Sequence, residues 1–120
     1  MLTLFLSSLL FTNVVTMPPE IRIFDANDIL VERLAKCESS MRVFALNKKE
    51  WHGESAGLLQ FRRETFREQM IKYGFTDTTE WDEADWENAL WDATIQRKLA
   101  KLMISDGLGH RWGCWNKIIR

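Results

Sequence analysis

Apolar residues recur at helical spacing along much of the chain, and this periodicity constrains the fold more than any other feature. Two stripes carry it, Ile29, Leu30, Leu34 and Ala35 in the first and Ile95, Leu99, Leu102 and Met103 in the second. Runs of strand length rich in Val, Ile and Thr, with alternating polarity, are missing from the sequence. We therefore expect a mainly α-helical domain with one core, which 120 residues suffice to build.

Local signals place the expected elements. The predicted helices are residues 27–38, 63–73 and 92–105, and a short last element is expected at about 110–119. Asp92 is a candidate N-cap for the third segment, and Gly74 ends the second. Residues 41–56 lack a helical period and predict an irregular loop or small hairpin, after which Gly57 begins a compact apolar turn.

The first seventeen residues differ from the rest. Residues 1–17 carry no charge, and their apolar run has the length of a signal-peptide core. Two interpretations remain open: an export signal or uncleaved membrane anchor, and a buried N-terminal helix. Because Pro18 and Pro19 interrupt any helix, we divide the chain into this segment, a linker at 18–26 and a domain at 27–120.

Charge and composition narrow the class of partner. The net charge is −1 and the basic residues are not clustered, which argues against nucleic acid. Six Trp and seven Phe can fill a core or line a groove for sugar rings, so a glycan is the better candidate. The two cysteines, Cys37 and Cys114, would pair in an exported protein and remain reduced thiols in a cytosolic one.

A carboxylate and an amide stand at positions that suit glycan cleavage. Glu38 lies where the first predicted helix gives way to a polar loop, and Gln60 ends the apolar turn. A single positioned acid can protonate the leaving oxygen as a glycosidic bond breaks.

The order of several short motifs resembles the lysozyme-like lytic transglycosylases. The resemblance is nearest to the small bacterial transglycosylase-like domains that include the resuscitation-promoting factors. It covers about residues 25–118 and rests on Cys37-Glu38-Ser39-Ser40, Ala45, Asn47, Gly57-Leu58-Leu59-Gln60-Phe61, Thr65-Phe66, Tyr73-Gly74, Asp92, Gln96, Ala100, Met103-Ile104, Asp106-Gly107, Trp112 and Cys114. The Ala-Tyr-Asn-Ala-Gly run of larger members has no counterpart here.

This resemblance implies a lysozyme-like fold and a role for each matching residue. Glu38 matches the single catalytic acid, Ser39 a residue that helps hold it, and Gln60 the glutamine of the glycan cleft. Cys37 and Cys114 match a disulfide-forming pair. The implied protein is a monomer, secreted or in the cell envelope, that cleaves the bond between N-acetylmuramic acid and N-acetylglucosamine in peptidoglycan. Residues 1–17 would supply any membrane association.

Other sequence features have weaker functional interpretations. Trp51 and Trp112 flank the motifs and are candidates for sugar contact. The acidic stretch 77–92 lacks the spacing of a calcium loop, and His52 and His110 have no third ligand nearby in sequence. We therefore expect no metal and no cofactor.

Two alternative functions remain open. A hydrolytic muramidase, such as a phage endolysin, would need a second carboxylate if it inverts, and Glu50, Glu54 and Glu64 are the candidates. A weakly active glycan-binding module would keep the fold without needing Glu38 as an acid.

Overall fold

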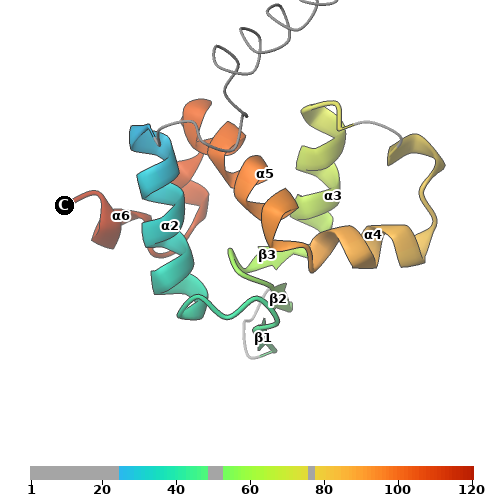
Figure 1. Ribbon diagram of the computed structural model, residues 1–120, viewed down its shortest axis with the longest axis horizontal. Helices are drawn as coiled ribbons and strands as arrows, with labels where there is room; N and C mark the ends of the chain where they lie inside the picture. The colour runs from blue at the N-terminus through green and yellow to red at the C-terminus, as the bar shows by residue number, and fades with distance from the viewer. Residues whose placement is uncertain (1–24, 49–52, 76–77) are drawn as a thin grey trace, which may run out of the picture.

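Helices make up most of the structure, which confirms the expected mainly α-helical class. A computed structural model describes residues 25–48, 53–75 and 78–120 (Figure 1). Its helices are α2 (Ala26–Ser39), α3 (Arg63–Lys72), α4 (Glu83–Leu90), α5 (Ala93–Ser105) and α6 (Trp115–Ile118), with 3-10 turns η2 (Thr78–Glu80) and η3 (Gly109–Arg111). The expected segment at 1–17 lies outside the described residues. In the ranges that are described, no helix has both the length and the apolar character to span a membrane.

The first described helix begins and ends on strong local signals. Asp25 and Asp28 form a reciprocal capping box, in which each carboxylate accepts the other residue's backbone N–H at 2.9 Å. The helix ends at Ser40, whose φ of 56° is left-handed and whose N–H donates to the Lys36 carbonyl. Met41 is also left-handed, with φ of 64°. The chain therefore turns away sharply just after Glu38.

A small antiparallel sheet stands beside the helices, where the sequence predicts a loop or hairpin. Its strands are β1 (Leu46–Asn47), β2 (Ser55–Ala56) and β3 (Phe61–Arg62), in that order. Residue Ala56 pairs with both Leu46 and Phe61. The turn between β2 and β3 is the Gly57–Gln60 motif, and its Leu58 and Leu59 are buried in the core.

The central helix α5 packs against α2, α3 and α4. Its buried face carries Gln96, Leu99, Ala100, Met103 and Ile104. This face is rotated from the predicted stripe, since Leu102 is 39% exposed. The buried face of α5 includes Gln96, a polar residue that is fully buried and that the predicted apolar stripe left out.

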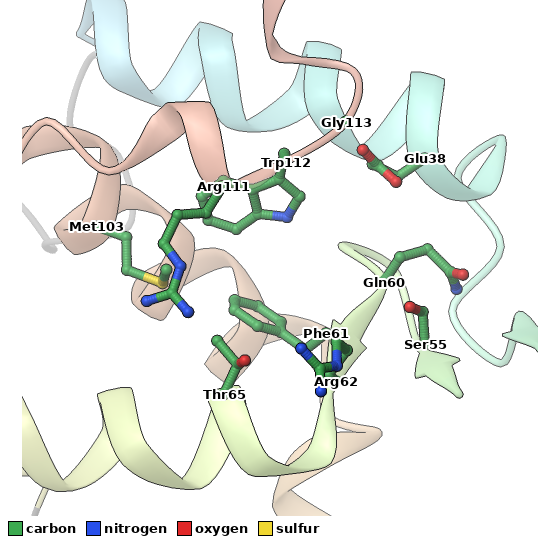
Figure 2. Close-up of a pocket in the computed structure, with 10 residues that line it drawn as sticks. All are labelled: Glu38, Ser55, Gln60, Phe61, Arg62, Thr65, Met103, Arg111, Trp112 and Gly113. Carbon is green, nitrogen blue, oxygen red and sulfur yellow. The ribbon is translucent and has the colours of Figure 1, made fainter. Parts of the chain in front are cut away.

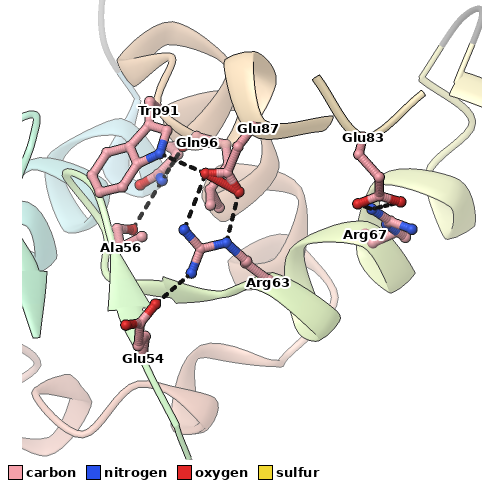
Figure 3. A network of polar contacts seen from close by, with 9 residues as sticks. Glu54, Ala56, Arg63, Arg67, Glu83, Glu87, Trp91 and Gln96 are labelled. Carbon is pink, nitrogen blue, oxygen red and sulfur yellow. Dashed lines mark hydrogen bonds and ion pairs between the residues drawn. The ribbon is translucent and has the colours of Figure 1, made fainter. Parts of the chain in front are cut away.

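The acidic stretch contains a helix that the sequence analysis did not predict. Helix α4 begins with a second capping box, Asp82 with Asp85, and buries Trp86, Ala89 and Leu90. Its outer face joins a polar network (Figure 3). Arg63 donates two hydrogen bonds to Glu87, at 2.7 and 3.0 Å, and one to Glu54 at 2.8 Å. The network therefore ties the start of α3 to α4 and to the residue before β2.

Candidate active site

A cleft of about 370 Å³ opens beside the end of α2, within the size range of small-molecule sites. One wall comes from α2 and the segment between η3 and α6, and the other from the β2–β3 hairpin and the start of α3 (Figure 2). Its lining residues are Glu38, Ser55, Gln60, Phe61, Arg62, Thr65, Met103, Arg111, Trp112 and Gly113. The cleft therefore brings together Glu38, Gln60 and Trp112 from three separate parts of the sequence.

Glu38 occupies the last turn of α2 and is half-buried. One carboxylate oxygen, Oε2, accepts the backbone N–H of Cys114 at 3.1 Å. A carboxyl group in this setting is held in place without being sealed from a ligand.

A disulfide links α2 to the residue before α6 within one wall of the cleft, which confirms the pairing of Cys37 with Cys114. Their Cα atoms are 6.2 Å apart and 77 positions apart in sequence. Cys37 immediately precedes Glu38, and Cys114 supplies the N–H that the Glu38 carboxylate accepts. The covalent bond thus keeps donor and acceptor next to each other. A disulfide is also consistent with a location outside the cytoplasm.

Gln60 lines the cleft, but its amide nitrogen already donates hydrogen bonds to two backbone carbonyls. Its two N–H groups donate to the carbonyls of Ala45, at 3.1 Å, and Gly57, at 3.0 Å. These bonds hold a left-handed residue, with φ of 54°, at the end of the turn. Because an amide nitrogen has two donors, the part of Gln60 that can serve a ligand is its oxygen.

Ser39 lies elsewhere than the resemblance implies. It is 2% exposed, does not line the cleft, and its hydroxyl donates to the Ala35 carbonyl one turn earlier at 3.0 Å. The single donor of Ser39 thus stabilises the helix end, and its expected role in holding Glu38 or binding substrate stays a prediction. Among the described residues, the Cys114 N–H is a group that holds Glu38 in this geometry.

Trp112 forms part of the cleft wall and part of the core. It is 7% exposed, contacts Phe61 edge to face at 5.6 Å between ring centroids, and donates its indole N–H to the Leu59 carbonyl at 2.9 Å. A sugar can meet only the small part of the ring that reaches the cleft. The other tryptophan proposed for sugar contact, Trp51, lies outside the described residues.

One residue important for the site, Gln96, gained no role from the sequence. Gln96 is fully buried, and its Oε1 accepts the Leu59 N–H at 2.7 Å while its Nε2 donates to the Ala56 carbonyl at 3.1 Å. Gln96 and Trp112 thus fix the turn from two directions. The available signal was a polar side chain within an apolar helical stripe.

The structure describes two of the three candidate second carboxylates, and neither of these two lines the cleft. Glu54 is paired with Arg63, and Glu64 is exposed in the first turn of α3. Neither lines the cleft, and Glu50 lies outside the described residues. Glu38 is therefore the single carboxylate among the cleft residues that the structure describes. No group of three His, Cys, Asp or Glu residues in residues 25–48, 53–75 and 78–120 is placed to hold a metal ion.

Comparison of the chain with models of protein families, with curated proteins and with solved structures gives no match in any of the three.

Proposed function

We propose that this domain is a lysozyme-like enzyme that cleaves the glycan strands of bacterial peptidoglycan as a lytic transglycosylase. The observation that carries the proposal is the placement of Glu38. It is the single carboxylate among the described cleft residues, it is half-buried, and it faces the turn that ends at Gln60 (Figure 2). The sequence resemblance assigns the catalytic acid to the same residue.

The chemistry needs only one acid. Protonated Glu38 gives its proton to the glycosidic oxygen as the bond to the muramic acid carbon breaks. The substrate's own acetamido oxygen stabilises the sugar cation. The Glu38 carboxylate then takes the proton from the 6-hydroxyl of the same sugar, whose oxygen closes a 1,6-anhydro ring. Glu38 ends protonated, and water is not consumed.

The surrounding residues support this cycle by holding the acid still. The Cys114 N–H contacts one carboxylate oxygen, and the disulfide restrains both partners. Preorganised contacts of this kind avoid reorganisation during the reaction. The amide oxygen of Gln60 and the exposed edge of Trp112 are the proposed sugar contacts. Secretion, or residence in the cell envelope, is part of this proposal and agrees with the disulfide.

The test is release of soluble fragments from purified peptidoglycan by the full chain. We expect Glu38→Gln to abolish release while keeping the acceptor for the Cys114 N–H. Glu64→Gln is the matched control, because it removes an exposed carboxylate outside the cleft, and it should release fragments at the wild-type rate. Equal release by wild type and Glu38→Gln would show that Glu38 is not the acid, and no release by either would leave only a glycan-binding role; both results would contradict the proposal.

A further inference from the structure

Two arginines line the cleft, and the proposed reaction uses neither. Arg62 ends β3 and precedes α3, while Arg111 ends η3 on the opposite wall. Figure 2 shows Trp112 between Glu38 and the guanidinium of Arg111. Arg62 and Thr65 lie on the facing wall. The cleft therefore carries positive charge away from the acid.

The other arginines of this region behave differently. Arg63, Arg67 and Arg97 each form an ion pair with a glutamate, at 2.7 to 3.0 Å. Within the described part of the chain, Arg62 and Arg111 take part in no such pair and no side-chain hydrogen bond. Their donors face a space of about 370 Å³ that contains no second acid among its described residues.

A guanidinium presents a planar set of donors that matches a carboxylate. The sugar backbone of peptidoglycan carries no negative charge that two arginines could bind. Its muramic acid units do carry a side chain with carboxylates, either in the peptide stem or, when the peptide is removed, on the lactyl group itself. This is the part of the substrate that complements the charge of the cleft.

We propose that Arg62 and Arg111 form a carboxylate-binding subsite that recognises the acidic side chain of the muramic acid unit. The inference rests on the proposed function and adds a specificity to it. With the sugar bond at Glu38, a side chain that extends past Trp112 brings its carboxylate between the two guanidinium groups. Substrates without this carboxylate lose that contact.

Binding to the full chain carrying Glu38→Gln separates recognition from cleavage. Three soluble ligands are compared by calorimetry: a disaccharide with its peptide stem, the same disaccharide with a free lactyl carboxylate, and diacetylchitobiose, which has no carboxylate. The added Arg62→Gln/Arg111→Gln change should weaken the ligands that reach the subsite by about tenfold or more, and leave diacetylchitobiose unchanged. Arg120→Gln, which removes an exposed arginine outside the cleft, is the charge control and should change nothing.

The pattern across ligands identifies the carboxylate. Loss confined to the peptide-bearing ligand assigns the subsite to the stem, and loss confined to the lactyl ligand assigns it to the sugar's own acid. Equal binding of all three ligands, or equal weakening by Arg120→Gln, overturns the inference. If wild type still cleaves peptidoglycan in that case, the proposed function stands without the subsite. If wild type cleaves nothing and Glu38→Gln binds none of the three, both proposals fail.

Discussion

Replacing Gly57 with alanine tests how the turn beside the candidate acid is built. Gly57 has φ of +83°, and a Cβ added there would lie 2.2 Å from Nε2 of Gln96. The left-handed backbone alone costs an L-residue about 1–2 kcal/mol. Gln96 cannot move aside freely, because it is fully buried and bonded to Leu59 and Ala56. Loss of these two buried hydrogen bonds adds about 2–4 kcal/mol.

We therefore expect Gly57→Ala to lower the free energy of unfolding by about 3–6 kcal/mol, a large part of the stability of a small domain. Urea denaturation followed by tryptophan fluorescence measures it. Gly74→Ala is the matched control, since Gly74 is also left-handed, at φ of +67°, but a Cβ there meets nothing within 4 Å. Gly74→Ala should lower the free energy of unfolding only by the cost of the left-handed backbone, about 1–2 kcal/mol.

A double-mutant cycle with Gln96→Ala isolates the contact between the two residues. In that background the clash is gone, so Gly57→Ala should cost about 1–2 kcal/mol, which leaves a coupling of about 2–4 kcal/mol. Equal costs in both backgrounds, or equal costs for Gly57→Ala and Gly74→Ala, would refute the close approach of Gln96 to the turn.

Three further predictions follow from the site and its supports. Glu38→Gln should reduce turnover on peptidoglycan by about 10²–10⁴-fold without lowering the melting temperature, because it removes a proton donor and keeps an acceptor; loss of fold in circular dichroism would point to a structural role instead. Replacing Cys37 and Cys114 together with serine should lower the free energy of unfolding by about 4.5 kcal/mol for a separation of 77 residues, and lower turnover as well, as checked by urea titration and product release; unchanged turnover in the folded double variant would show that the bond does not position Glu38. Hydrogen bonds from Arg63 hold the pKa of Glu87 below its ordinary 4.5, so this pair stabilises the fold fully above that pH and less as pH falls through the lowered value. Both side chains are over 40% exposed, so Glu87→Gln should reduce the loss of unfolding free energy at acid pH by less than about 1 kcal/mol, as measured by urea denaturation at a series of pH values. An unchanged dependence of the unfolding free energy on pH would mean that the pair contributes nothing.

Much of the fold could be predicted because its signals are local. The start of α5 follows from the capping side chain of Asp92, and α3 ends beside Gly74, as expected. Helix α4 was missed because its acids resemble a solvated surface, although the Asp82–Asp85 spacing is a capping box. A capping signal outweighs composition at such a boundary.

The candidate site was predictable only in part, because side-chain direction depends on tertiary packing. Glu38 and Gln60 share the cleft as expected. Ser39 follows Ala35 by four positions and therefore falls on the buried face of the same helix. A polar residue type does not by itself indicate such a buried position. Arg62 and Arg111 are 49 positions apart, and no local pattern announces that they line one cleft.

The mass of the products formed from purified peptidoglycan in ¹⁸O-labelled water tests the central claim most directly. If Glu38 acts alone as acid and then base, the new muramic acid end is a 1,6-anhydro sugar, lighter by one water than a hydrolysed end and free of label. Glu38→Gln should yield neither product. Labelled reducing ends would show that water attacks the sugar and would contradict transglycosylation, and unlabelled anhydro ends made equally well by Glu38→Gln would remove Glu38 from the reaction.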